Sequence, residues 1–235
     1  MTDTATPTID AATTTLAQAV TANPGAARVF DKLGLDFCCH GKRSIAEASA
    51  AAGLDPALVV AELGELAVVD QEWSDLEPAA LVDHIVETHH DYLHEEMPLL
   101  VALAAKVASV HGERHPELAE VSRLTAAIQD DLDPHLTKEE RILFPAIKAL
   151  TEGEREFPFG PIANPIRMMM AEHDGTGELL EAIRAATNGY AVPADGCASY
   201  QSLYQRLEAL EADTHLHVHK ENHHLFPTAI EMAES

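Results

Sequence analysis

The chain has 235 residues, of which 46% are hydrophobic and 5% aromatic, so it is long enough for one or two globular domains with a buried core. Its formal net charge of −24 argues against direct binding to nucleic-acid phosphates or to an anionic membrane surface. The sequence contains no apolar run near the roughly 20 residues of a membrane span, no signal peptide and no disulfide framework, so we expect a cytoplasmic protein.

The first part of the chain predicts a small helical domain over residues 1–70. Its polar N-terminal end is expected to be frayed. Short helices should follow, the last of them ending near Val69, because capping residues or proline precede the helical runs and glycine follows two of them. The residues that start or end these helices are Asn23, Pro24, Gly34, Ser44, Gly53, Asp55 and Pro56.

Residues 71–78 are polar and are predicted to form a linker, and residues 79–235 carry four long helical patterns with short turns between them. Pro134 and Pro145 should bend the second helix or end it early. Four such helices predict an up-down-up-down bundle, so the expected fold is all-α. The predicted spans are about 78–111, 116–150, 162–188 and 197–233.

Two stretches of the predicted bundle repeat one another. The first begins at His135 and the second at His217, and both read H-x3-E-x3-L-F-P. Each follows a second repeated motif, H-D-x3-E, which begins at His90 and at His173. His90 lies 45 residues before His135, and His173 lies 44 residues before His217. This part of the chain is therefore organised around a duplication.

Within each copy, a histidine and a glutamate four residues apart lie on one face of a helix, as in His135/Glu139 and His217/Glu221. One such pair is as often a solvated face as a binding site, but two pairs with the same flanking residues are hard to obtain by chance. Helix phase selects His90 as their partner in the first helix, because it lies on an apolar stripe. That stripe contains Val82, Val86, Leu93, Met97 and Leu100.

The register of the helices brings these side chains to one level. In an antiparallel hairpin the two histidines of each copy come level, once the longer loop of the second hairpin absorbs about 8 Å. Buried imidazoles and carboxylates need a cation, and carboxylates that bridge, together with imidazoles, favour two iron ions over one zinc ion. The predicted metal ligands are His90, His135, Glu139, His173, His217 and Glu221, with the glutamates as bridges.

The other histidines are predicted to lie outside this site. His111 shares the apolar stripe, but it is 21 residues from His90, about 30 Å along a helix, and is left out. Glu172 is a plain surface residue, a support for the site or a gate for access to it. The histidines expected to face solvent or to contact the ligands from outside are His84, His89, His94, His115, His215, His219, His223 and His224.

Cys38 and Cys39 lie in a predicted turn beside His40. Two interpretations stay open for them: small buried apolar residues, or a reactive thiol pair for redox chemistry or iron transfer. Adjacent cysteines rarely form a disulfide with each other without backbone strain. Cys197, near the start of the fourth long helix, is expected to be structural.

The whole pattern resembles the repair-of-iron-centres family, the iron–sulfur cluster repair di-iron proteins, over about residues 16–230. The likeness rests on L-D-F-C-C-x-G-K, which begins at Leu35, and on H-D, H-x3-E-E-x-x-L-F-P, E-H-D and H-x3-E-N-x-x-L-F-P. It implies a hemerythrin-like di-iron bundle behind a small N-terminal domain, with the same six ligands. His40 departs from the family, which usually has glycine after the cysteines.

The resemblance also implies a function. Iron–sulfur clusters damaged by nitrosative or oxidative stress would be repaired by donation of iron, from a pair of ions that is oxo-bridged when oxidised, to damaged or apo proteins. An enzymatic alternative is nitric oxide binding and reduction to nitrous oxide at the same centre, so enzyme status is open, as is homodimer formation.

A third hypothesis is a hemerythrin-type protein that carries or senses oxygen. Such a carrier has one more histidine, whereas here Gly177 stands four residues after His173, which argues against reversible oxygen storage. A ferritin-like ferroxidase fits less well, because those sites use more carboxylates and a different spacing.

Overall fold

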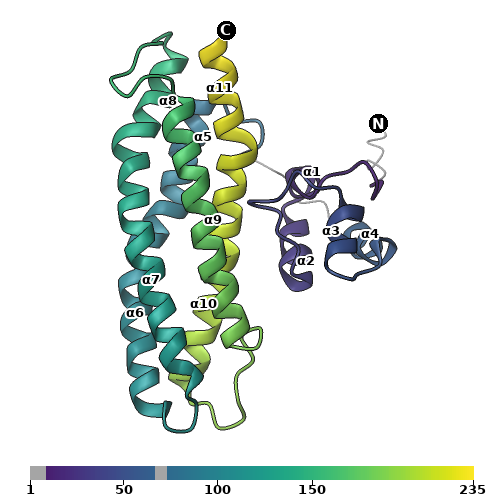
Figure 1. The fold of residues 1–235 in the computed structure, drawn as a ribbon, viewed down its shortest axis with the longest axis vertical. Helices are drawn as coiled ribbons and strands as arrows, with labels where there is room; N and C mark the ends of the chain where they lie inside the picture. The colour runs from purple at the N-terminus through teal and green to yellow at the C-terminus, as the bar shows by residue number, and fades with distance from the viewer. Residues whose placement is uncertain (1–8, 67–72) are drawn as a thin grey trace, which may run out of the picture. The chain divides into compact units, whose positions relative to one another are not determined.

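The structure, a computed structural model, describes residues 9–66 and 73–235 (Figure 1). These residues form helices and no strands, so the predicted all-α fold class is confirmed. The chain divides into two compact units, Met1–Asp75 and Leu76–Ser235, which are described separately below. Among the described residues, no helix is both long and apolar enough to pass through a membrane.

The predicted domains, 1–70 and 79–235 with a linker over 71–78, lie near this division, and their limits stay a prediction. Two expectations fall wholly or partly outside the described residues, namely the frayed N-terminal end and the first residues of the linker. The last short helix ends at Gly64, with Glu65 as its C-cap, and not near Val69 as predicted.

The first unit contains four short helices, α1 (Leu16–Ala22), α2 (Gly25–Leu33), α3 (Ile45–Ala51) and α4 (Pro56–Gly64). Capping residues fix their ends. Thr15 and Ser44 each accept a hydrogen bond from the backbone N–H three residues on, and each donates its own backbone N–H to the side chain found there. Gly34 ends α2 in the left-handed conformation, with φ 66°, as the sequence predicts.

The second unit is the predicted bundle, in which four long helices run alternately up and down (Figure 1). The first, second and fourth long helices each contain one π-helical turn, and the third long helix, α9, has none. In chain order the elements are α5 (Pro78–Ile85), η1 (Val86–His90), α6 (Asp91–His111), α7 (Glu117–Lys138), η2 (Glu139–Leu143), α8 (Phe144–Thr151), α9 (Ala163–Ala186), α10 (Ala198–Lys220), η3 (Glu221–Leu225) and α11 (Phe226–Glu234).

The prolines of the second long helix do not end it early, so that alternative of the prediction is wrong. Pro134 lies inside α7, which continues through it to Lys138. Pro145 lies in the first turn of α8, directly after η2. A proline has no N–H to donate and crowds the carbonyl four residues before it, and the wider π turn that precedes Pro145 accommodates both effects. Pro227 holds the same place after η3, so the repeated L-F-P marks the return from a π turn to an α-helix.

The largest apolar cluster joins α6, α7, α9 and α10. Its members include five side chains with 0% exposure: Leu100, Val121, Ile128, Leu203 and Leu210. Burying an aliphatic side chain of this size contributes roughly 1.5–3 kcal/mol. This packing holds the four helices in fixed register, which in turn fixes the polar residues that the same helices carry.

One ion pair is buried beside this core. Glu211 is 2% exposed. Arg184 donates from Nε to Glu211 Oε1 at 3.0 Å and from Nη2 to Oε2. The guanidinium also lies 5.2 Å from the centre of the Tyr190 ring. Because the guanidinium fork satisfies both carboxylate oxygens, the charge of Glu211 is tolerated inside the bundle.

We predict that Arg184→Met lowers the free energy of unfolding of the bundle by about 3 kcal/mol, because it leaves the Glu211 carboxylate buried without its partner. The double variant Arg184→Met/Glu211→Leu should recover most of this loss, since an apolar pair needs no compensation. Chemical denaturation of the metal-free proteins measures both values. A double variant no more stable than the single one would contradict the argument.

Candidate metal centre

Six polar side chains, one or more from each long helix, converge in the interior of the second unit, and they are the six predicted ligands. Each is at most 3% exposed. They form two groups that could each hold a metal ion, with ligand atoms within 4.8 Å of one another. Glu139 and Glu221 belong to both groups. The first group adds His90 and His217, and the second adds His135 and His173.

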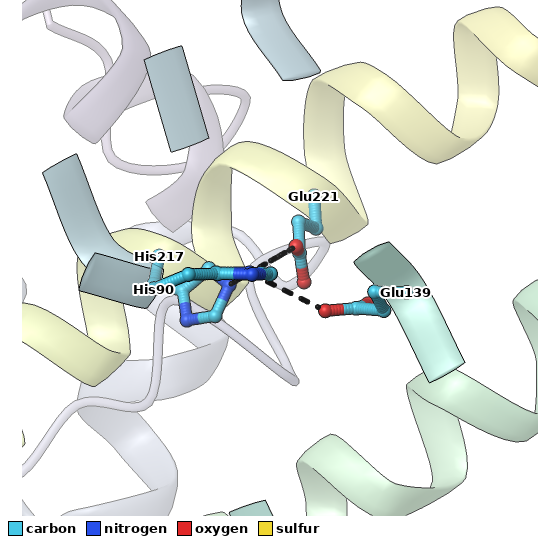
Figure 2. Close-up of side chains that lie close together, drawn as sticks. All are labelled: His90, Glu139, His217 and Glu221. Carbon is cyan, nitrogen blue, oxygen red and sulfur yellow. Dashed lines mark hydrogen bonds and ion pairs between the residues drawn. The ribbon is translucent and has the colours of Figure 1, made fainter. Parts of the chain in front are cut away.

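In the first group, Nε2 of His90 lies 3.1 Å from Nε2 of His217 and 3.5 Å from Oε2 of Glu139. Nε2 of His217 lies 3.0 Å from Oε1 of Glu221. Figure 2 shows the two imidazole rings and the two carboxylates turned toward one another, with the glutamates on different helices. All four residues therefore present a nitrogen or oxygen to one small space.

The second group repeats this arrangement. Nε2 of His135 lies 3.1 Å from Nε2 of His173 and 3.3 Å from Oε2 of Glu139. Nε2 of His173 lies 3.1 Å from Oε2 of Glu221. Each group thus combines one histidine from each copy of the repeat, so the duplication in the sequence becomes a pseudo-twofold arrangement in the fold.

These atoms fit metal ions better than they fit one another. Two nitrogens about 2.1 Å from one ion and at about a right angle would be about 3.0 Å apart, and the paired Nε2 atoms are 3.1 Å apart in both groups. Both carboxylate oxygens of Glu139 are buried without a hydrogen-bond partner among the described residues. An uncompensated buried carboxylate is costly, and a cation in either group would compensate it.

The pKa values of the histidines reflect the same charges. Burial opposes protonation of His135, but the negative charge of Glu139, 3.3 Å away, raises the pKa of His135 to about 9. The pKa of His217 is also raised, because Glu221 outweighs the effect of burial. Burial, followed by the nearby His217, lowers the pKa of His90. Imidazoles bind metal in their neutral form, so metal uptake here releases protons.

Three of the four imidazoles are oriented through their Nδ1 atoms. The contacts are His90 with Glu140 at 3.1 Å, His135 with Glu172 at 2.9 Å and His173 with Asn222 at 3.0 Å. Such contacts fix the ring and its tautomer and make the other nitrogen a better metal ligand. Glu172 is thus a support for the site, and its interpretation as a plain surface residue is wrong.

The phenylalanines of the repeated L-F-P motif cover His90 and His173, the histidines of the two H-D motifs. Phe144 stacks on His90 with ring centres 5.3 Å apart, and Phe226 stacks on His173 with ring centres 6.0 Å apart. Both phenylalanines are at most 2% exposed. The other acidic residues of the two H-D-x3-E motifs are exposed, namely Asp91, Glu95, Asp174 and Glu178. Only the histidine of each such motif therefore belongs to the centre.

His89 is a residue whose importance the sequence did not reveal. It is 2% exposed, and its ring stacks on that of His217 with centres 5.3 Å apart. The phase of a simple α-helix predicts a buried Val86, but Ile85 is buried and Val86 is only half-buried. The extra residue in the η1 turn causes this shift, so both His89 and His90 face the interior.

Two other buried histidines lie outside both groups. His219 is 0% exposed, so the expectation that it faces solvent is wrong, and it packs against the rings of His223 and His224. His111 is 6% exposed, and its Nε2 lies 3.1 Å from Sγ of the exposed Cys197. Leaving His111 out of the predicted ligand set therefore agrees with its position.

The cysteine turn of the first unit forms a separate group, made of Asp36, Cys38 and Cys39. Oδ1 of Asp36 accepts from the N–H groups of Cys38 at 3.1 Å and Cys39 at 2.9 Å, and from the Cys38 thiol at 3.3 Å. A hydrogen bond with Cys39, followed by burial, raises the pKa of Cys38 well above its ordinary value. Cys38 therefore stays a thiol, and the half-buried Cys39 is the more accessible of the two.

Comparison with known proteins agrees with this geometry. Residues 81–229 match the hemerythrin HHE cation binding domain. The iron–sulfur cluster repair proteins YtfE of Escherichia coli strain UMN026 and of Shigella boydii strain Sb227 are each 35% identical over 209 residues, covering 88% of this chain and 92% of theirs. The chain belongs to the hemerythrin-like iron–sulfur cluster repair family. Residues 12–67 match a domain of unknown function, DUF542. The hemerythrin-like domain of this chain, residues 81–229, binds iron.

We predict that Glu139→Gln abolishes binding of both metal ions, because this carboxylate belongs to both groups. In the metal-free protein the same change should lower the pKa of His135, since it removes the carboxylate charge that raises that pKa. Metal analysis and an NMR titration of the imidazole measure the two effects. Glu178→Gln, at an exposed position of the repeat, is the matched control and should change neither. Two ions retained in Glu139→Gln would count against the shared carboxylate.

We also predict that Asp36→Ala loosens the cysteine turn by about 1 kcal/mol, because the backbone N–H groups of Cys38 and Cys39 lose their acceptor. Burial would raise the pKa of Asp36, but hydrogen bonds from His40, Cys39 and Cys38 hold it below its ordinary 3.8. A lowered pKa means that the stabilisation is present above pH 3.8 and disappears as the pH falls through the lower value.

Amide hydrogen exchange at Cys38 and Cys39 in the full chain measures this effect. The wild-type protein should lose its protection relative to Asp36→Ala as the solution is acidified. Equal exchange in both proteins at neutral pH would show that Asp36 does not hold the turn.

Proposed function

We propose that this protein holds two iron ions in its bundle and repairs damaged iron–sulfur clusters of other proteins by donating iron. The observation that carries the proposal is the sharing of Glu139 and Glu221 between two groups, each completed by two histidines. The family relationship supports it, since the relatives covered over most of their length are named iron–sulfur cluster repair proteins.

In this proposal His90 and His217 bind one ion, and His135 and His173 bind the other. Glu139 and Glu221 bridge the two ions and cancel part of their charge. Bound iron supplies a redox-active centre with ligand positions that the protein does not fill. Imidazole and carboxylate ligands bind iron less tightly than the cysteine thiolates and sulfides of a cluster do, so transfer from this site to a cluster runs toward the softer ligands.

The cysteine turn is the second part of the proposal. Cys39 is the more accessible of the two cysteines, and its Sγ lies 3.8 Å from Sγ of Cys38, which stays a protonated thiol. We infer that Cys39, with Cys38 beside it, receives iron or a redox partner during repair. Asp36 keeps the turn closed through its hydrogen bonds to the backbone.

Nitric oxide reduction is the alternative function, and the same centre favours it. Two imidazoles and two shared carboxylates leave each ion with room for a small ligand, so both ions could bind nitric oxide side by side. The residues would then orient two small molecules rather than release metal. Reversible oxygen carriage has less support, because α9 offers one histidine, and Gly177 stands one turn further along.

We predict that the iron-loaded protein restores activity to an enzyme whose [4Fe–4S] cluster has lost one iron, under reducing conditions and without other iron. Glu221→Gln should reduce the restored activity at least about tenfold, because it removes a shared ligand. Cys39→Ser should slow the transfer while leaving the bundle's iron content unchanged. Enzyme activity and the cluster absorbance measure the result, with Glu178→Gln as the matched control.

Two outcomes would contradict iron donation. One is restored activity with metal-free protein, and the other is no recovery with fully loaded protein. Sustained nitrous oxide formation from nitric oxide and an added electron donor, together with no recovery, would establish the alternative function instead. Zinc as the metal found in freshly purified protein would argue against both.

A further inference from the structure

The duplication relates the residues around the two groups, and related residues differ in chemistry at two of these positions. Along the aligned repeats, Lys138 corresponds to Lys220 and Glu172 corresponds to His89. Glu172 and His89 each directly precede the histidine of an H-D motif. The residue beside His135 is therefore a carboxylate, Glu172, whereas its counterpart beside His217 is an imidazole, His89. These are called the first and the second side of the pseudo-twofold arrangement.

On the first side, Glu172 connects a lysine to a proposed ligand. Its Oε1 accepts a hydrogen bond from the Lys138 ammonium, and its Oε2 lies 2.9 Å from Nδ1 of His135. The carboxylate accepts a hydrogen bond from the Nδ1–H group of His135 and so increases the electron density that the ring offers at Nε2. The lysine charge is balanced by the same carboxylate.

On the second side, an imidazole binds the lysine. Nζ of Lys220 lies 2.7 Å from Nε2 of His89, and Nδ1 of His89 lies 2.8 Å from Oδ1 of Asp213. An ammonium group donates and cannot accept, so Nε2 of His89 is the acceptor and its Nδ1 donates to Asp213. Both ring nitrogens of His89 are therefore engaged, and neither is available to His217.

His89 instead contacts His217 through the face of its ring. The two rings are nearly parallel, at 9°, with centres 5.3 Å apart. Nδ1 of His217 is buried and has no hydrogen-bond partner among the described residues. The stacked ring of His89 fixes the plane of the His217 ring but accepts no hydrogen bond from its Nδ1–H group. His89 therefore cannot strengthen His217 as a metal ligand in the way that Glu172 strengthens His135.

The remaining outer contacts, a carboxylate in the first group and an amide in the second, reduce this difference but do not remove it. In the first group Glu140 supports His90 at 3.1 Å, and in the second group Asn222 supports His173 at 3.0 Å. These two contacts occupy equivalent places in the repeats. The second group therefore has both imidazoles hydrogen-bonded from outside, and the first group has one.

We propose that the ion held by His90 and His217 is the weaker bound of the two and leaves first, and that His89 is the positioning residue that sets this order. The inference rests on the two-ion centre of the proposed function. Loss of an outer contact lowers metal affinity by about 10–100-fold, so the two affinities should differ by that factor. An iron donor built in this way releases one ion while the other still compensates the shared carboxylates.

Stepwise removal of iron tests the order of release. The iron-loaded full chain is exposed to a ferrous chelator, and the iron content and Mössbauer spectrum are followed until half of the iron has gone. Crystals of this half-loaded protein then give the anomalous scattering at the two positions. The proposal requires two release steps about 10–100-fold apart and a depleted position beside His217. Equal depletion, or depletion beside His135 first, would overturn it.

Substitutions at the related pair test whether His89 sets the order. His89→Glu introduces the carboxylate of the other side, and His89→Gln introduces an acceptor without a charge. Both should slow the first release step toward the rate of the second, and both leave all six ligands in place. Glu172→His makes the reciprocal change and should speed release of the ion beside His135.

The variants also separate a structural effect from a positioning effect. A change in unfolding temperature with unchanged release order would assign His89 a purely structural role and overturn the inference. The proposed function fails differently: wild-type protein that binds fewer than two ions, or restores no cluster, refutes it whatever the variants do. Two ions released in one step would leave iron donation standing and refute the role of His89.

Discussion

The bundle depends on two carboxylates buried where nothing but a cation could balance them. Glu139 and Glu221 are 0% exposed, and each lies within reach of histidines from both copies of the repeat. An unbalanced charge at such a position costs several kcal/mol. The free energy that holds the glutamates there comes from the apolar core along the same helices, where the side chains contribute through burial alone. The site is thus held by packing that has no chemical role of its own.

The π turns orient these carboxylates toward the interior of the bundle. His90 is the last residue of η1, Glu139 the first of η2 and Glu221 the first of η3. A π turn adds a residue and locally rotates the helix, and such turns occur frequently at functional sites. The α9 helix, which brings one histidine, runs without one. In each case the rotation lets neighbouring residues face inward together, as His89 and His90 do.

This rotation also decides how far the sequence could predict the site. The ligand set followed from spacing, because four-residue pairs and a duplicated pattern survive small changes in helix geometry. The outer contacts did not follow. His89 is buried because η1 shifts the helix phase by a residue, and Glu172 reaches His135 across a helix interface that no local pattern describes. The prolines were expected to bend the second long helix or end it early, and it does not end there, because Pro145 follows a π turn and the helix continues.

Duplication by itself would make two equal sites, and equal sites release their ions together. A change to a ligand could make them unequal, but Glu139 and Glu221 are shared, so altering either would disturb both ions. The outer residues are not shared. Replacing the carboxylate of Glu172 with the imidazole of its counterpart His89 affects one histidine and leaves every ligand in place. A change in the outer contacts can therefore make one ion of a duplicated centre bind more weakly than the other, so that one ion is released while the other stays bound.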